Sequence, residues 1–512
     1  MLRMLTTKHT RPLLFFVVMF AIFTACQPQP PILVYVTPTH EGEIAGVGTA
    51  VPTVVSTAAV TASATPTVAA TETLAPQSTG PTATFEGAVV VPGYSLPPTS
   101  TPRPTNTVPP SATPVPGTTQ PPPPTTEPPT SQPGTPQAAL PNLDPSRMGI
   151  QLDPTLSQDD WTDALIDIQK LGVKWLKVQV AWKQLQPTNA QEISVDFRRL
   201  EIYLETAYNH GLDVLVSIAK APNWARSNQT EDGPPDNPQA LVDFLNLFLQ
   251  EVGPSIDAIE IWNEPNLSRE WQGQPINGQT YMKYFVPAHN AIQGYVQAMQ
   301  TDPQRPRNFP LYVITAGLAP TGDSDGSRDD RAYLQEMYSA GLSQYPDAYI
   351  GVHPYSWANP PDATCCSPGD PGWDDNPRFF FSDNITDYRD IMVRNGDSEG
   401  KMWATEFGYA TWEYFPGAPP EEWMGWVNEC QQGNNIVRAF QIGQSLDYMG
   451  PMILWNLNFA MLAGMVESRN EQAGYSLLVP LNPRERAGYW MLYDAIRPDE
   501  QLKAYSRCPG PG

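Results

Sequence analysis

Strand-like and helix-like segments alternate eight times between Pro141 and the end of the chain, and this alternation constrains the fold most. The strand-like segments are short apolar runs such as Leu212–Ile218, which suit strands covered on both faces. Eight pairs in roughly 370 residues are typical of a (β/α)8 barrel of the TIM type, an α/β fold. An open doubly wound sheet would alternate in the same way. Polar and aromatic residues after strands 3, 4, 6, 7 and 8 favour the barrel, which we expect over residues 141–512.

The segments expected in this domain follow in chain order. The strands are Met148–Leu152, Val173–Trp182, Leu212–Ile218, Ile256–Trp262, Leu311–Ala316, Ala348–His353, Lys401–Thr405 and Pro451–Trp455. The helices are Ser157–Leu171, Ser194–His210, Asn237–Val252, Gly278–Met299, Asp330–Leu342, Ile385–Arg394, Asn434–Tyr448 and Arg484–Ile496. Ser157 is expected to be an N-cap.

The first 26 residues have the pattern of an export signal. A basic start precedes the apolar run Leu13–Phe23, which is too short for a spanning helix of ~20 apolar residues. The run ends in Phe23-Thr24-Ala25-Cys26, which resembles the lipobox of bacterial lipoproteins, with Phe23 where leucine is usual. The resemblance implies a signal peptide over 1–26, a lipid on Cys26 and anchoring to the outer face of the cytoplasmic membrane. Plain secretion or an uncleaved anchor are the alternatives.

Residues 27–140 are rich in Pro, Thr and Ser and carry almost no charge. Such a segment cannot bury enough apolar surface to offset the entropy lost on ordering. Its proline-rich stretches favour an extended, semi-rigid spacer. We expect a disordered linker that holds the barrel away from the cell surface.

The formal net charge of −23 narrows the class of partner. A surface this acidic offers no basic stripe for nucleic acid, and a neutral substrate fits it better than an acidic polymer. With five histidines and no Cys/His spacing of a zinc site, neither metal nor cofactor is expected. We expect a monomer.

Four cysteines besides Cys26 permit two disulfides in an exported chain: Cys365, Cys366, Cys430 and Cys508. Their connectivity cannot be read from the sequence. Because Cys365 and Cys366 are neighbours, we expect each to bond elsewhere.

Two glutamates end strand-like runs, Glu264 after the fourth and Glu406 after the seventh. Barrel enzymes build their sites at the carboxyl ends of the strands, so both carboxyl groups are expected in one pocket. Paired carboxyl groups of this kind fit hydrolysis of a glycosidic bond. The alternative is that both are structural, ion-paired residues.

Five short stretches carry a resemblance to retaining glycoside hydrolases of clan A. They are Ile261-Trp262-Asn263-Glu264-Pro265-Asn266, Gly351-Val352-His353-Pro354-Tyr355, Thr405-Glu406-Phe407-Gly408, Ala221-Pro222-Asn223-Trp224 and Leu454-Trp455-Asn456. Each is weak alone, but together they lie in the right order over roughly Met148 to Trp490. The chain looks most like family 39, with family 5 cellulase-type enzymes next.

The resemblance implies a role for each matched residue. Glu264 would be the general acid/base and Glu406 the nucleophile, with Tyr355 donating a hydrogen bond to Glu406. Asn263 would bind the sugar 2-hydroxyl, and His353 would orient the cluster or bind the leaving group. A hydrogen-bonded core histidine is the alternative for His353. The acid is expected to have its pKa raised by burial or by a neighbouring carboxylate.

Glu260 shares strand parity with Glu264, so we expect it inside the barrel, where an unpaired charge is costly. Lys177 is its expected partner. Families of this clan commonly have an arginine at the end of strand 2, near the nucleophile. This chain has none in Lys177–Trp182.

Aromatic residues cluster after the strands, and sugar rings stack on flat aromatic faces. By resemblance Trp455 would form the floor of the reacting subsite, and Trp224 and Trp357 would be stacking platforms for sugar rings beside it. The others are Trp182, Trp271, Trp412 and Tyr414. Most tryptophans taken singly are core residues, which is the alternative here.

The leading hypothesis is a retaining glycoside hydrolase that cleaves β-linked O-glycosidic bonds in an extracellular polysaccharide. No added β-domain is evident after the eighth helix, which favours an open groove and endo action. The sugar stays open among xylan, mannan, glucan and exopolysaccharide. The alternative is a non-catalytic carbohydrate-binding or adhesion module displayed on a stalk.

Overall fold

The computed structural model describes residues 142–301, 311–366, 376–498 and residue 508. The predicted signal peptide 1–26 with Cys26, and the predicted linker 27–140, lie outside the described residues and stay predictions.

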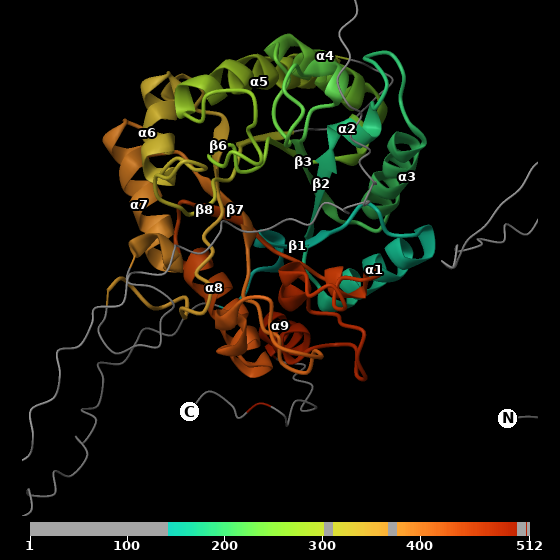
Figure 1. Cartoon of the computed structure of the whole chain (residues 1–512), viewed down its shortest axis with the longest axis vertical. Helices are drawn as coiled ribbons and strands as arrows, with labels where there is room; N and C mark the ends of the chain where they lie inside the picture. Colours follow the sequence, from blue (N-terminus) through green and yellow to red (C-terminus); the bar gives the residue numbers. More distant parts are fainter. Residues whose placement is uncertain (1–141, 302–310, 367–375, 499–507, 509–512) are drawn as a thin grey trace, which may run out of the picture. The chain divides into compact units, whose positions relative to one another are not determined.

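Eight parallel strands close into a barrel in the order of the chain, with β1 paired to both β2 and β8. The strands lie at the centre of Figure 1 with the helices outside them. Their bounds are β1 Met148–Leu152, β2 Trp175–Ala181, β3 Asp213–Ala219, β4 Ala258–Ile261, β5 Tyr312–Thr315, β6 Ala348–Val352, β7 Met402–Phe407 and β8 Met449–Leu454. The predicted (β/α)8 barrel is confirmed.

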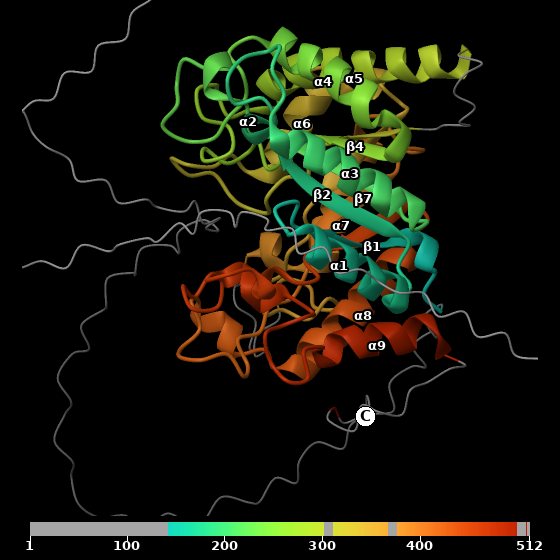
Figure 2. The same cartoon turned by 90° about the vertical axis from the view of Figure 1, so that its right-hand side faces the viewer.

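Each strand is followed by at least one helix, and Figure 2 shows several of them along the side of the barrel. The helices are α1 Gln158–Leu171, α2 Trp182–Leu185, α3 Val195–Asn209, α4 Pro238–Val252, α5 Gly278–Thr301, α6 Asp330–Ser339, α7 Phe381–Arg394, α8 Glu429–Ser445 and α9 Ala487–Ile496. Helix α2 is a single extra turn that the sequence pattern did not predict.

Local sequence signals set the ends of α1 as expected. The Ser157 hydroxyl accepts from the backbone N–H of Asp160 at 3.2 Å, which confirms the predicted N-cap. Gly172 ends the helix with φ of 96°, a left-handed conformation that glycine adopts without strain. Between them Trp161, Leu165 and Ile168 bury one face. Loss of the cap in Ser157→Ala would cost about 1 kcal/mol.

The amino ends of the strands are closed by an aromatic cluster. Trp175 and Trp403 meet edge to face at a centroid distance of 4.8 Å, and Tyr312 and Tyr349 pack against Trp403 at 5.6 and 5.8 Å. Apolar filling of this kind makes the barrel interior a packed core rather than a pore. The opposite end, at the carboxyl termini of the strands, is where polar side chains gather.

Several predicted boundaries differ from those of the structure. Helix α8 begins at Glu429 rather than Asn434, because Asn428 and Gln431 form a capping box that the apolar pattern does not reveal. Strand β7 runs to Phe407 instead of Thr405, so Glu406 belongs to the strand. The proline inside α5, Pro287, does not end that helix.

The disulfide expectation is wrong in part. Cys430 pairs with Cys508 at a Cα–Cα distance of 5.5 Å, which ties the start of α8 to the segment beyond α9. Cys365 and Cys366, which are adjacent in the chain, form a disulfide with each other, although each was expected to bond elsewhere. In the described part of the chain, no helix has both the length and the apolar character to cross a bilayer.

Candidate active site

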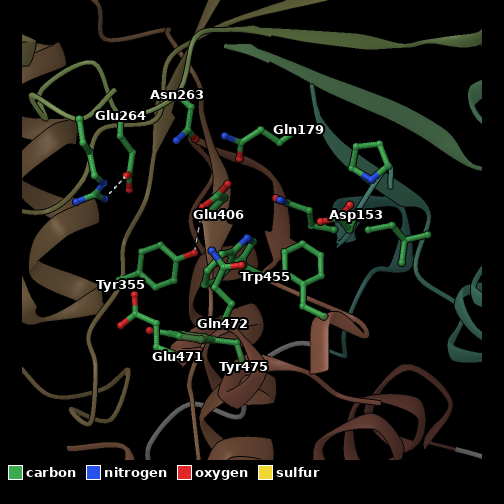
Figure 3. A pocket seen from close by; sticks show the side chains of 15 residues that line it. Asp153, Gln179, Asn263, Glu264, Tyr355, Glu406, Trp455, Glu471, Gln472 and Tyr475 are labelled. Carbon is green, nitrogen blue, oxygen red and sulfur yellow. Dashed lines mark hydrogen bonds and ion pairs between the residues drawn. The ribbon is translucent and has the colours of Figure 1, made fainter. Parts of the chain in front are cut away.

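A pocket of about 690 Å³, counting the space open to solvent, lies at the carboxyl ends of the strands (Figure 3). Its lining combines carboxyl, amide and aromatic side chains, as sugar sites do. The lining residues are Gln151, Leu152, Asp153, Pro154, Gln179, Asn263, Glu264, Arg269, Tyr355, Glu406, Trp455, Phe459, Glu471, Gln472 and Tyr475. Six residues besides the two glutamates were predicted for this site, and three of them, Asn263, Tyr355 and Trp455, line the pocket.

Glu264 reaches this pocket from a strained turn directly after β4. Trp262 and Glu264 have φ of 78° and 42°, in the left-handed region that costs a non-glycine residue about 1–3 kcal/mol. Backbone bonds hold the turn: Trp262 N–H donates to Ile218 at 2.9 Å and Glu264 N–H to Gly317 at 3.1 Å. The turn aims the Glu264 carboxyl group into the pocket while leaving it 6% exposed.

Glu406 faces the same pocket from β7 and is 5% exposed. Tyr355 donates its hydroxyl to Glu406 Oε2 at 3.1 Å, a contact drawn in Figure 3. Lys177 donates to Oε1 at 3.0 Å. With its amide oriented to satisfy both of its atoms, Gln151 donates to Oε1 at 3.2 Å and accepts from Trp455 Nε1 at 3.2 Å. Hydrogen-bond donors thus contact both carboxyl oxygens of Glu406.

Lys177 joins Glu406 to a third carboxylate deeper in the barrel. Its Nζ lies 3.0 Å from Glu260 Oε2 and 3.1 Å from the Thr405 carbonyl oxygen, and neither charged group is exposed. The predicted Glu260–Lys177 pair is therefore confirmed. Burial opposes the charge on both groups, yet their attraction holds the pKa of Glu260 well below its usual range and raises that of Lys177. Lys177, on β2, is thus a cation in direct contact with the predicted nucleophile Glu406.

His353 lies under the pocket, fully buried, with its ring between three carboxylates. Its Nδ1 is 3.4 Å from Glu264 Oε1 and 3.8 Å from Glu406 Oε2, while Nε2 is 3.8 Å from Glu260 Oε1. Burial works to lower the pKa of His353, but the three neighbouring carboxylates, Glu406, Glu260 and Glu264, outweigh it and raise the pKa to about 9. Gly317 makes room for the ring, because a Cβ there would lie 2.2 Å from it.

The expectation of a raised pKa for Glu264 is wrong. Burial alone would raise it, but the hydrogen bond with His353 and the Arg269 charge lower it below the usual value. Arg269 Nη2 lies 3.1 Å from Glu264 Oε2. The cause is the pair of neighbours, of which the sequence predicted His353 in this cluster but not Arg269.

Asn263 and Trp455 line the pocket next to the two glutamates (Figure 3). Asn263 is 4% exposed, and its Oδ1 accepts no hydrogen bond from the described residues. Trp455 packs edge-on against Tyr475 and Tyr355 at centroid distances of 5.0 and 6.0 Å. An indole held by two tyrosines beside a carboxyl pair offers a rigid face for a sugar ring.

The structure does not bring Trp224 and Trp357 into the lining of this pocket. Trp224 donates Nε1 to the Gln186 carbonyl oxygen at 2.7 Å, and Trp357 packs on Phe379 at 4.3 Å. Their role as sugar platforms stays a prediction. Trp182 and Trp271 are core residues, exposed by 0% and 1%.

Sequence reasoning missed several lining residues. Gln151 and Gln179 are polar residues near the carboxyl ends of β1 and β2, and the rule that located Glu264 could have found them. Asp153 and Arg269 lie in loops after β1 and β4 and carry no local signal. Glu471, Gln472 and Tyr475 come from a 3-10 helix, η8 (Glu471–Tyr475), in the long loop after β8, whose path the sequence does not predict.

Within the ranges that the structure describes, no group of three or more His, Cys, Asp or Glu side chains is arranged to hold a metal ion.

No family model and no curated protein matches this chain. Solved structures similar to it include a family 39 glycoside hydrolase from the gut symbiont Bacteroides cellulosilyticus WH2, at 14% identity and a TM-score of 0.48, over 68% of this chain and 63% of the other. A GH5_18 from Bifidobacterium longum subsp. infantis is similar at 12% identity and a TM-score of 0.48, over 69% of this chain and 79% of the other. A glucosidase from Croceicoccus marinus is similar at 10% identity and a TM-score of 0.46, over 69% and 67%.

The chain thus spans less than two thirds of the length of the first of these structures. The similar structures include both kinds of enzyme that the sequence motifs resemble, family 39 and family 5.

Proposed function

We propose that this protein is a retaining glycoside hydrolase that uses Glu264 and Glu406 in a double displacement. One observation carries the proposal: the two glutamates are buried in one pocket, and a single nitrogen, His353 Nδ1, lies within 4 Å of both carboxyl groups. Their oxygens lie beside Trp455 at the carboxyl ends of barrel strands, where such enzymes keep their sites.

In the first step Glu406 attacks the anomeric carbon while Glu264 protonates the departing oxygen, which forms a glycosyl ester on Glu406. In the second step Glu264 takes a proton from water, and this water releases the sugar with its original anomeric configuration. Asn263, with its unused Oδ1, would bind the 2-hydroxyl of the reacting sugar. Trp455 would stack against that ring.

The pocket chemistry favours a neutral, β-linked polysaccharide. Arg269 is the cationic residue among the lining side chains, and it is engaged with Glu264. Asp153 and Glu471 add further negative charge to the lining. An acidic polymer would be repelled by this arrangement and by the net charge of −23. We propose cleavage inside the chain of the polymer.

We also propose an exported protein, held to the outer face of the cytoplasmic membrane by a lipid on Cys26, acting as a monomer. The Cys430–Cys508 disulfide supports an oxidising compartment outside the cytosol. Secretion without the lipid is the alternative.

A non-catalytic carbohydrate-binding module is the second candidate, because the aromatic lining serves binding as well. It accounts less well for the buried charges. Keeping Glu260, Lys177 and His353 ionised or paired beneath the pocket is expensive, and a sugar-binding surface has no use for them.

Incubation of the purified protein with xylan, mannan and β-glucan, followed by chromatographic analysis of the products, tests the proposal. We expect oligosaccharides of mixed length from at least one polymer. Binding without any product from the whole panel would favour the non-catalytic module.

A further inference from the structure

The proposed mechanism needs a proton on Glu264, yet its two neighbours favour the ionised form. Arg269 pairs with Oε2 at 3.1 Å, and His353 Nδ1 lies 3.4 Å from Oε1. Both neighbours lower the pKa of Glu264 in spite of its burial. A neighbouring group that holds a proton and can release it to Glu264 would resolve this conflict.

The charge balance around the pocket indicates which residue holds this proton. Three buried carboxylates, Glu260, Glu264 and Glu406, face two permanent cations, Lys177 and Arg269. Uncompensated charge is costly in a dry interior, and a protonated His353 makes the set neutral.

The geometry of the ring agrees with this balance. Both ring nitrogens of His353 face carboxylates, at 3.4 and 3.8 Å on the Nδ1 side and 3.8 Å on the Nε2 side. A ring with an acceptor on each side favours a proton on both nitrogens. The groups that face the ring or act on Glu264 are Lys177, Glu260, Arg269, Glu270, Tyr355 and Glu406.

We propose that His353 holds the acid proton before substrate binds and passes it to Glu264 when a saccharide fills the pocket. The inference rests on the proposed function, because it assumes that Glu264 is the acid. In the transfer the Nδ1–H bond breaks and an Oε1–H bond forms on Glu264. An imidazolium and a carboxylate become a neutral imidazole and a carboxylic acid, so the total charge is unchanged.

Substrate binding supplies the driving force for this transfer. A saccharide expels water from the pocket, and low polarity favours the neutral pair over the charged one. Sugar hydroxyl groups that take up the Arg269 donors would remove the other group that holds Glu264 ionised. His353 touches no substrate in this scheme and acts through Glu264.

The protonation state can be measured without any activity. In ligand-free protein with ¹⁵N-labelled histidine, we expect one of the five histidines to remain an imidazolium at pH 8. A saturating disaccharide product should convert that signal to a neutral tautomer. If all five are neutral at pH 8, or if the imidazolium persists with sugar bound, the proposal is overturned.

Kinetics with aryl β-glycosides of the same disaccharide separate proton storage by His353 from a purely structural role of this residue. A phenyl leaving group needs an acid and a 2,4-dinitrophenyl group does not, so His353→Gln should lower kcat/KM about 100-fold on the first and less than about fivefold on the second. Equal losses on both substrates would indicate a structural role. If the variant does not fold, the spectra of the unmodified protein still decide. Absence of hydrolysis by the unmodified protein would contradict the proposed function, and not the proton storage by His353 alone.

Discussion

The ammonium nitrogen of Lys177 lies 3.0 Å from Oε1 of Glu406 and also 3.0 Å from Oε2 of Glu260. One buried cation on β2 thus links the predicted nucleophile on β7 to a carboxylate on β4. This connection explains how two acidic side chains can be buried so close together. It also makes Lys177 the residue on which both the fold and the site depend.

Removal of this cation should be strongly destabilising. In Lys177→Met, Glu260 and Glu406 lose their shared partner, and we expect the free energy of unfolding to fall by about 3–5 kcal/mol. Urea titration followed by tryptophan fluorescence measures the change. The double variant Lys177→Met with Glu260→Gln should recover part of the loss, whereas Lys183→Met, at a partly exposed pair, should lose no more than about 1 kcal/mol. A double variant that is less stable than the single one would contradict the pairing.

The stability contributed by His353 should depend on pH in the alkaline range. Its pKa is raised from 6.5 to about 9 in the folded protein. A raised pKa stabilises the folded state fully below pH 6.5, and this contribution is lost as the pH rises through 9. We expect a loss of about 3 kcal/mol across that window. Unfolding curves of the parent and of His353→Gln between pH 6 and 10 should differ in slope, while His210→Gln should follow the parent.

Glu270 should also make stability fall as the pH rises, but in a lower pH range. Burial raises its pKa from 4.5 to about 7, and its Oε2 accepts no hydrogen bond from the described residues. Because the folded state favours the neutral acid, stability is lost as the pH rises from 4.5 through 7. Glu270→Gln should therefore be more stable than the parent by up to about 3 kcal/mol at pH 8 and nearly equal at pH 4. Equal stability of the two proteins at pH 8 would show that Glu270 is not held in this way.

Trp455 should contribute to substrate binding as a stacking surface. Loss of the indole in Trp455→Ala should lower kcat/KM by about 10-fold or more, because a stacked aromatic contact is worth roughly 1–2 kcal/mol. Trp224→Ala provides the comparison, since Trp224 lies outside the pocket lining. A large loss in Trp224→Ala as well would place a further sugar-binding subsite beside it.

The fold and the positions of the two glutamates could be predicted because both follow from periodicity. Apolar runs of strand length and amphipathic helices repeat along the chain, and the barrel brings the ends of distant strands together. Glu264 and Glu406 meet for that reason. The pairing of Glu260 with Lys177 followed from strand parity and the cost of a lone buried charge.

What the sequence could not supply was set by loop paths and by side-chain environments. Arg269 reaches Glu264 from an irregular loop, and its effect on the pKa of Glu264 reverses the shift expected from burial. Glu471 and Tyr475 enter the pocket from a loop whose course no local pattern reveals. The bond between the adjacent residues Cys365 and Cys366 could not be predicted, because it depends on which other cysteines meet in space.

The central claim, hydrolysis through Glu406, is tested most directly by the rate of Glu406→Gln on the polysaccharide that the unmodified protein cleaves. The substitution keeps the size of the side chain and removes its nucleophilic oxygen. Glu399→Gln, an exposed glutamate before the amino end of β7, is the matched control. We predict that Glu406→Gln loses activity by at least about 10⁴-fold while the control keeps it. Undiminished cleavage by Glu406→Gln would contradict the account.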